Sequence, residues 1–285
     1  MMIKYPRGQV LLITVLVLSI AVTIALSLIG RSVSDVSMSR NLEESARAFS
    51  AAEAGIEEAL RTNTRQTNTS YTTNAGYTSD IAIIGDSTGV YTLSTITVGQ
   101  ADTVWLVAHN DSNGIDFPPS YYYPNATIDI CWSHATPAPA LEVAIYYKSG
   151  GTTYLVTRGA YDPDAARRSS NKFSTVTDLN NISEGCGAMT NVYRQTVTIP
   201  TGVGITPLFM LIRPYYGNAT VTVTPLGSNK LPTQGFEVSS VGCTQITESG
   251  CTEGGVTRKI VVRRQYPGPS TIFDYSVYSQ GSLEK

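Results

Sequence analysis

The sequence predicts an α+β protein, with one long N-terminal helix followed by a mostly antiparallel, β-sandwich-like exterior domain. Three observations support this class. No proline interrupts residues 9–60, a Thr- and Asn-rich segment predicted to be a linker fills residues 61–80, and short apolar or alternating runs recur across residues 81–285. With 285 residues, 42% of them hydrophobic, the chain is long enough to bury a sizeable core.

The first part of the predicted helix, residues 10–30, contains no charged side chain. As a helix rising about 1.5 Å per residue, it matches the roughly 30 Å hydrocarbon thickness of a bilayer. Lys4 and Arg7 precede it without an acidic residue, so the positive-inside rule places the N-terminus in the cytoplasm and the rest of the chain outside. We therefore expect a single-pass membrane helix, because a cleaved secretory signal peptide has a shorter apolar region.

Good helix formers continue beyond this span and predict an amphipathic extension to residue 60. Its apolar stripe is formed by Leu42, Ala46, Phe49, Ile56 and Leu60. Glu53 lies on or beside this stripe, where it either needs a partner from the exterior domain or a neighbouring subunit, or forms a solvated edge of the stripe. Gly30, at the membrane boundary, is the weakest point of the helix.

Two motifs in this region resemble a known family. Arg7-Gly8 directly before an apolar helix is similar to the class III leader of type IV pilins and pseudopilins. The sequence MSRN at residues 38–41, followed by AFSAAEAGIE at residues 48–57, resembles the N-terminal segment of PilX-type minor pilins. The resemblance covers about the first 60 residues and implies a leader at residues 1–8, cleavage between Gly8 and Gln9 by a prepilin peptidase, and methylation of the new N-terminus. It also implies other pilin subunits and a membrane assembly machinery as partners, with membrane lipid around the helix before assembly.

The chain departs from the main repeating subunits of such filaments at the fifth mature position. Major pilins usually carry Glu there, whereas this chain has Ile13. A carboxylate inside a bilayer is costly unless it is paired, so its absence changes the energetics as well as the motif. The departure favours a minor or tip subunit. Gln9 in place of Phe or Met at the first mature position puts methylation in doubt.

Small hydroxyl side chains line one face of the membrane segment, because Ser19, Thr23 and Ser27 recur every four residues. Such residues permit close helix approach and interhelical hydrogen bonds in lipid, or they bond back to the carbonyls of their own helix. The candidate positions for helix packing in a filament are Ile13, Ser19, Thr23, Ser27, Phe49 and Glu53.

The exterior domain is predicted to have about ten to twelve strands and no helix. The expected strands are residues 91–98, 103–108, 126–132, 141–148, 153–158, 193–199, 208–212, 219–224, 236–240, 256–262 and 272–278. Its four cysteines can pair outside the reducing cytosol. Cys243 and Cys251 are close enough to close one small loop, which leaves Cys131 and Cys186 as a long-range pair. The alternative is four buried free thiols.

The sequence offers little for catalysis or nucleic-acid binding. The formal charge of −2 provides no basic surface for nucleic acid, and the chain has neither a Gly-x-Ser-x-Gly elbow nor a phosphate-binding loop. We expect no enzyme activity, no cofactor and no metal, since Cys131 is a better candidate for a disulfide than for zinc binding with His134. Oxygen-rich turns at residues 111–116 and 162–164 fit Asx turns as well as calcium sites.

Seventeen tyrosines offer stacking faces for a glycan or an adhesive surface. The sequence therefore predicts a non-enzymatic filament subunit of the minor pilin or pseudopilin type. A membrane-anchored exterior binding module that never enters a filament is the main alternative. An exported β-fold hydrolase would need a cleft that gathers carboxylates such as Asp111, Asp116, Asp129 or Asp162.

Overall fold

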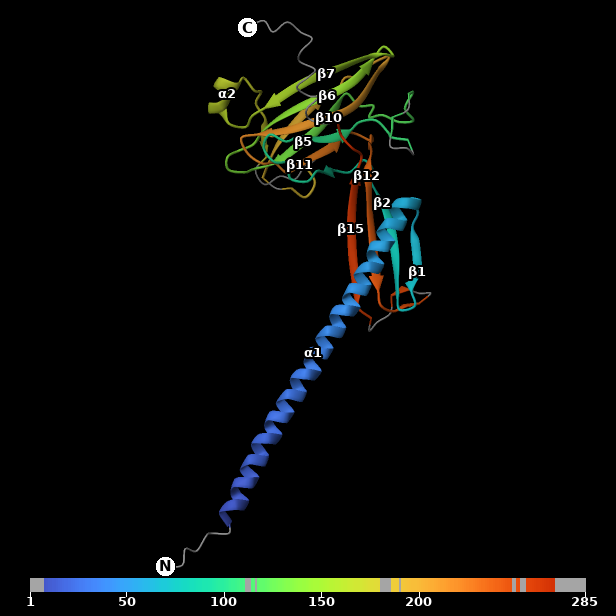
Figure 1. Cartoon of the computed structure of the whole chain (residues 1–285). Helices are drawn as coiled ribbons and strands as arrows, with labels where there is room; N and C mark the ends of the chain where they lie inside the picture. The colour runs from blue at the N-terminus through green and yellow to red at the C-terminus, as the bar shows by residue number, and fades with distance from the viewer. Residues whose placement is uncertain are drawn as a thin grey trace, which may run out of the picture. The chain divides into compact units, whose positions relative to one another are not determined.

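The computed structural model describes residues 8–110, 114–115, 117–179, 186–189, 191–247, 250–251 and 255–269 (Figure 1). The chain forms two compact units. Unit 1 comprises Met1–Ile81 and Val238–Val262, and unit 2 comprises Ala82–Glu237 and Arg263–Lys285. Together they show the predicted α+β class, with one long apolar N-terminal helix followed by mostly antiparallel sheets.

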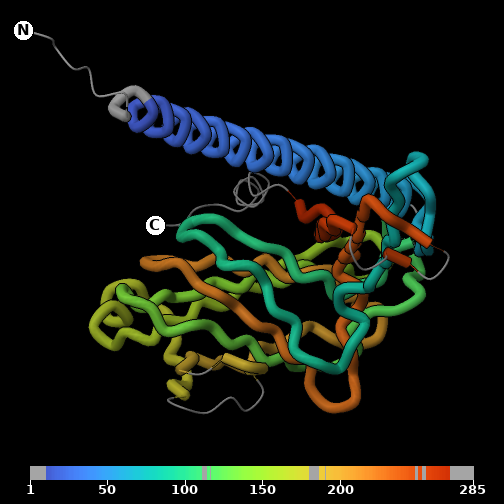
Figure 2. The backbone as a smooth tube through the Cα atoms, turned by 90° about the horizontal axis from the view of Figure 1, so that it is seen from below, coloured from blue at the N-terminus to red at the C-terminus, as the bar shows by residue number. Residues whose placement is uncertain are grey.

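Unit 1 contains helix α1, which spans Gly8–Thr62 and confirms the helix predicted for residues 9–60. Figures 1 and 2 show it as one continuous helix, and its 55 residues correspond to about 82 Å. The helix ends at Asn63, which takes a left-handed conformation with φ 52° while its amide donates to the Ala59 carbonyl at 2.9 Å.

The sheet of unit 1 has the strand order β1-β2-β12-β15. Its strands are β1 (Gln66–Thr72), β2 (Ala75–Ser87), β12 (Leu231–Cys243) and β15 (Thr257–Gln265), of which the last three continue into unit 2. A small hairpin of β13 (Ile246–Thr247) and β14 (Gly250–Cys251) follows β12. The C-terminal part of α1 lies along one face of this sheet (Figure 1).

The linker predicted for residues 61–80 is wrong, because this segment forms β1 and the start of β2 as an antiparallel hairpin. Its inward positions carry Tyr77 and Ser79, which are 6% and 1% exposed, so the buried face is too polar to produce an apolar periodicity. The single exterior domain predicted for residues 81–285 is also wrong as one contiguous unit, since Val238–Val262 returns to pack with the N-terminal segment.

Unit 2 is a sandwich of two sheets. The first has the order β4-β10-β6-β7, with β4 at Asp102–Trp105, β6 at Ala140–Ser149, β7 at Thr153–Tyr161 and β10 at Ile205–Tyr215. The second has the order β3-β11-β5-β9-β8, with β3 at Tyr91–Thr92, β5 at Thr127–Ser133, β8 at Thr177–Leu179, β9 at Val192–Thr198 and β11 at Val221–Pro225. Neighbouring strands within both sheets are antiparallel, as predicted.

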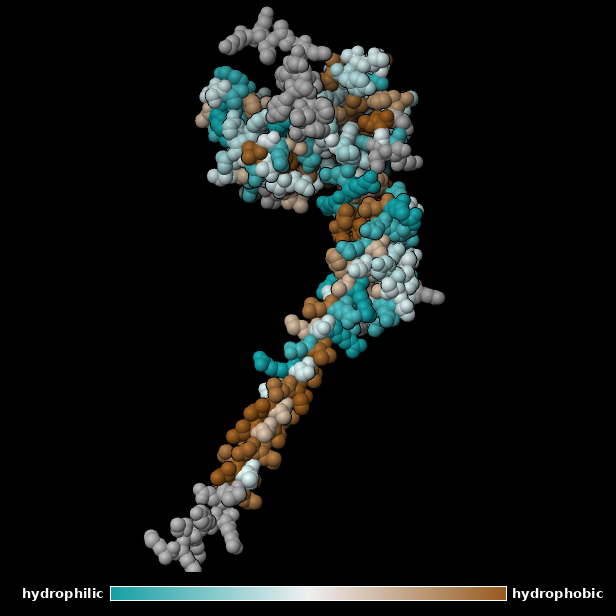
Figure 3. Space-filling view, viewed as in Figure 1, coloured by the Kyte–Doolittle hydropathy of each residue, from teal (hydrophilic) through white to brown (hydrophobic). Residues whose placement is uncertain are grey.

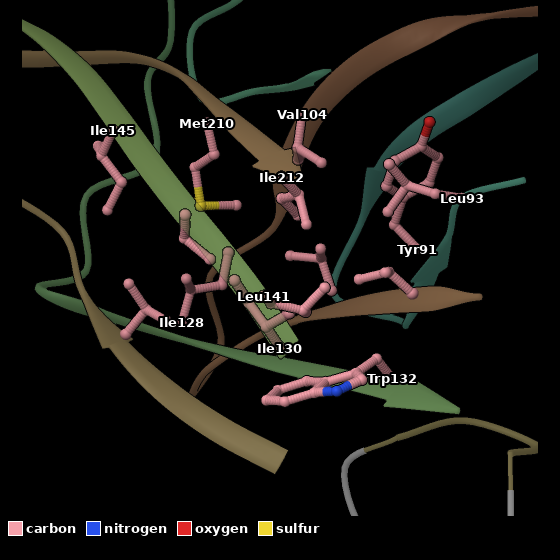
Figure 4. Packing of buried hydrophobic residues seen from close by; sticks show 14 of the residues in the cluster. Tyr91, Leu93, Val104, Ile128, Ile130, Trp132, Leu141, Ile145, Met210 and Ile212 are labelled. Carbon is pink, nitrogen blue, oxygen red and sulfur yellow. The ribbon is translucent and has the colours of Figure 1, made fainter. Parts of the chain in front are cut away.

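The core of unit 2 lies between these two sheets (Figure 4). Ile128, Ile130 and Trp132 alternate along β5, while Met210 and Ile212 face them from β10. All five are fully buried, and the Trp132 indole nitrogen donates to the Pro139 carbonyl at 2.9 Å. The core therefore satisfies the polar atom of this large side chain internally.

The sequence located most strands of unit 2 but missed its helix. Helix α2 (Ala165–Asn171) begins after Asp164, whose carboxylate accepts the amides of Ala166 and Arg167 as an N-cap. Strands β1, β2, β8, β13 and β14 were also not predicted, and the strand expected at residues 272–278 lies outside the described residues. Short elements of two to seven residues carry too little periodicity for detection from sequence.

Candidate functional site: the faces of helix α1

The N-terminal part of α1 exposes large apolar side chains all around the helix. From Leu11 to Ile29 every side chain is exposed, and Ile13 is 53% exposed. Figure 3 shows this stretch as a continuous hydrophobic band. Among the described residues, this helix is the one long and apolar enough to cross a membrane. Gly8 and Gln9 lie at its start, while residues 1–7 of the expected leader are outside the described residues.

The hydroxyl face of this segment bonds back to its own helix at two of its three positions. Ser19 donates to the Leu16 carbonyl and Thr23 to the Ile20 carbonyl, each at 2.8 Å. Ser27 has no hydrogen bond to a side chain or carbonyl among the described residues. The Ser19 and Thr23 hydroxyls are therefore satisfied without a neighbouring helix, and the small side chains of this face still permit close helix approach.

A different face of α1 packs on the unit 1 sheet, and it is made of alanines. Ala48, Ala51, Ala52 and Ala59 are fully buried, and Ile56 is 7% exposed. Across from them, a Cβ added to Gly242 of β12 would lie 2.1 Å from the Ala48 carbonyl oxygen. The two backbones therefore meet almost directly, which only small residues allow.

Gly55 extends this close contact between α1 and β12 along the helix. A Cβ added there would lie 2.2 Å from the Ser240 hydroxyl of β12 and 2.6 Å from the Tyr77 ring of β2. Val238 and Ile56 close its upper end in one apolar cluster. We call the contact between these alanines, Gly55 and β12 the helix seat.

The sheet buries only the C-terminal end of the apolar stripe predicted for α1, where Ile56 is 7% exposed and Leu60 packs against the same cluster. Farther toward the N-terminus, Leu42 and Phe49 are 65% and 46% exposed, while Ala48, Ala51 and Ala52 are buried. The prediction was wrong at Leu42 and Phe49 because hydrophobic periodicity weighs side-chain size, whereas a helix resting on a sheet backbone requires small side chains. Phe49 and Glu53, four residues apart, share a neighbouring face that stays exposed.

Glu53 forms no ion pair within the described part of the chain. Two nearby acidic residues behave differently, since Glu43 pairs with Arg47 at 2.5 Å and Glu58 with Arg61 at 2.6 Å. The partner that Glu53 was expected to find in the exterior domain is therefore not among the described residues. Its carboxylate stands in solvent beside the exposed ring of Phe49.

Both disulfides are present as predicted. Cys131 pairs with Cys186 across 5.7 Å between their Cα atoms, and Cys243 pairs with Cys251 across 5.8 Å. The alternative of four free thiols is wrong, because the chain has no free cysteine. The second bridge ties the β13–β14 hairpin to the end of β12, directly beside the helix seat at Gly242. Disulfides of this kind indicate an oxidising location outside the cytosol.

The oxygen-rich turn at residues 162–164 is an Asx turn, in which the Asp164 amide donates to the Asp162 carboxylate at 2.9 Å. Asp162 is fully buried, and its carboxylate accepts hydrogen bonds from Arg167 at 2.6 Å and Asn171 at 2.7 Å. Burial opposes ionisation of Asp162, but the hydrogen bonds from Arg167, a backbone amide and Asn171 outweigh it and hold the pKa of this carboxyl below its ordinary value. The turn at residues 111–116 lies largely outside the described residues.

The remaining candidate residues of unit 2 are separated. Asp129 is buried against Arg194, and His134 lies 3.0 Å from Asp178 while its ring stacks on Tyr193. No group of three or more His, Cys, Asp or Glu side chains that could hold a metal occurs within the described residues. These residues therefore form separate structural pairs.

The tyrosine clusters divide between core and surface. Tyr123 is fully buried and donates to the Thr127 carbonyl, whereas Tyr122 is 38% exposed. Tyr216 is exposed beneath the Arg167 guanidinium at 4.4 Å. Comparison with protein-family models, with curated proteins and with solved structures finds no match to this chain.

Proposed function

We propose that this chain is a minor pilin or pseudopilin, a non-enzymatic subunit of a type IV pilus or of a type II secretion-like filament. One observation carries the proposal: α1 joins a membrane-length apolar segment, whose side chains are exposed from Leu11 to Ile29, to a folded unit through the helix seat. A helix held only as an anchor needs no rigid continuation. A helix that moves from lipid into a fibre does need a rigid continuation, because the folded unit must move together with the helix.

The proposed mechanism is structural. The membrane holds the precursor with its N-terminus in the bacterial cytoplasm, and a prepilin peptidase cuts between Gly8 and Gln9. Cleavage removes Lys4 and Arg7, which changes the formal charge from −2 to −4 with 18 basic and 22 acidic residues remaining. The apolar segment then leaves lipid for an extracellular or periplasmic filament without carrying cytoplasmic charges across the hydrocarbon.

The side chains of α1 support a minor position in such a filament. Ile13 places no carboxylate in the hydrocarbon, so this subunit lacks the charge that a main subunit would offer to the neighbouring N-terminus. The exposed pair Phe49 and Glu53 leaves an aromatic and an acidic contact for another pilin subunit. We propose priming, capping or adhesion as its role in the fibre.

N-terminal processing tests this proposal. Mass spectrometry of the protein from native membranes, with and without the prepilin peptidase, should find a chain that begins at Gln9 only when the peptidase is present. A Gly8→Val variant should stay uncut, while Gly30→Ala, a matched glycine change farther along the same helix, should be processed normally. A chain that begins at Met1 or Met2 in both strains contradicts the filament proposal and leaves a membrane-anchored exterior binding module.

A further inference from the structure

The side of the unit 2 sandwich opens into a slot between β7 of the first sheet and β9 of the second. Its volume is about 290 Å³, close to the lower end of the roughly 300–1,000 Å³ typical of ligand clefts. Strand β7 is an edge strand, and β8 covers β9 only from Val192 to Arg194. The slot therefore lies where both sheets end.

The residues that line this slot occupy inward positions of the sandwich. Thr157 pairs with Ile145 and Gly159 with Val143, while Gln195 pairs with Ile130. Paired residues of neighbouring strands point to the same face of a sheet, and all three partners belong to the buried core. Inward positions that are normally apolar are thus occupied here by a hydroxyl, a glycine and an amide.

Gly159 keeps the slot open. A Cβ at this position would lie 2.3 Å from the Tyr161 hydroxyl oxygen and 2.8 Å from the adjacent ring carbon. The Tyr161 ring thus lies over the glycine and forms one wall of the slot. A side chain at residue 159 would displace that wall.

Three hydrogen-bonding groups at the inward positions of the slot are left for a ligand. The Thr157 and Tyr161 hydroxyls and the Gln195 side-chain oxygen have no hydrogen-bond partner among the described residues. Burial raises the pKa of the Tyr161 hydroxyl, so this group is a protonated donor at neutral pH. Together they supply two hydroxyls that donate or accept and one acceptor.

Apart from the hydroxyls of Thr196, which donates to Asp129 at 2.5 Å, and Thr198, the rest of the lining is apolar or already neutralised. Val143, Ile145 and Val197 form an apolar floor, each at most 4% exposed. Arg158, the one charged residue among those described that line the slot, donates to Glu142 at 2.6 Å. A charged ligand would find no unpaired counter-charge here, whereas a ring with hydroxyls on its rim and an apolar face matches both surfaces.

We propose that this slot binds a neutral sugar ring, either a monosaccharide or the terminal residue of a glycan. The apolar face of the ring lies on Val143, Ile145 and Val197, and its hydroxyls bond to Thr157, Tyr161 and Gln195. An extended polypeptide added to the edge of β7 is less suited, because the open groups are side-chain groups gathered in one slot. The inference does not rest on the filament, so its failure leaves the test of N-terminal processing unaffected.

Saturation-transfer NMR on the full chain tests the proposal, in a detergent without a sugar headgroup. The probes are glucose, galactose and N-acetylglucosamine titrated into the millimolar range. At least one should bind saturably, and Tyr161→Phe should weaken that binding about fivefold, the effect of one lost neutral hydrogen bond. Gly159→Ala should weaken it further, while Tyr154→Phe, an exposed tyrosine on the other face of β7, should leave it unchanged.

Three results would overturn the proposal. The first is that none of the sugars binds to the unmodified chain. The second is binding that survives both Tyr161→Phe and Gly159→Ala. The third is binding of an unfolded polypeptide, carboxymethylated α-lactalbumin, without binding of any sugar. Near-UV circular dichroism checks that each variant is folded, and Thr157→Val, which keeps the shape and strand preference of the residue, replaces any variant that is not.

Discussion

The two units of this chain are stabilised in different ways. The core cluster of unit 2 gathers 21 buried residues between two sheets, including Trp132 and Tyr123. The apolar cluster of unit 1 has only Ile56, Ala59 and Val238 as buried members. Unit 2 depends on large side chains removed from water, whereas unit 1 depends on the close approach of two backbones at the helix seat. The comparison predicts that different substitutions destabilise the two units.

Trp132→Ala should have the largest effect and should act on unit 2. The side chain is fully buried and its indole nitrogen is hydrogen-bonded, so we expect a loss of about 4 kcal/mol in the free energy of unfolding. Denaturant unfolding followed by near-UV circular dichroism measures it. Phe117→Ala, at a ring that is 41% exposed, should cost much less. Equal losses for the two variants would contradict the assignment of the core.

Gly242→Val should be the most damaging single change in unit 1. Its side chain would enter the backbone of α1 at Ala48 and Ala52, and we expect a loss of about 3 kcal/mol from the resulting overpacking. Limited proteolysis within Gln66–Thr72 and β15 should become faster. Gly30→Ala is the matched control, because nothing lies within 4 Å of its added Cβ. Unchanged proteolysis in Gly242→Val would show that the seat does not stabilise unit 1.

Asp162→Asn should have an intermediate effect on unit 2 that depends on pH. A carboxyl with a pKa lowered by folding stabilises the protein above its unfolded pKa of about 4, and this stabilisation is lost as pH falls through the folded value. We expect the variant to lose about 2 kcal/mol at neutral pH, since a hydrogen bond to a charged group is broken. Below pH 4 the difference from the unmodified chain should shrink. A difference that stays constant with pH would contradict the charged state of Asp162.

Phe49→Ala should have the smallest effect on folding, about 0.5 kcal/mol or less, because the ring is 46% exposed and lies outside the seat. Under the proposed function, the same variant should reduce recovery of the subunit in sheared filaments. Thermal unfolding and filament recovery separate the two effects. Normal recovery, or a large loss of thermal stability, would remove the role assigned to this face.

Local sequence determined the long apolar helix, the disulfides and most strands. An uncharged run such as residues 10–30 can be recognised from local sequence alone, because a helix that is to cross lipid needs apolar side chains on every face. The strands around Ile130 and Met210 were predictable because alternate positions face one core. The spacing of Cys243 and Cys251 predicted their bridge for a similarly local reason.

Tertiary structure alone decided which face of α1 is buried and what residues 61–80 become. Periodicity pointed to Phe49, but β12 approaches through Gly242 and selects the face of Ala48 and Ala52. The β1–β2 hairpin likewise depends on β12, which begins at Leu231, far away in sequence. Sequence records how apolar a side chain is, whereas the distance between two backbones is set by segments that meet only in the folded chain.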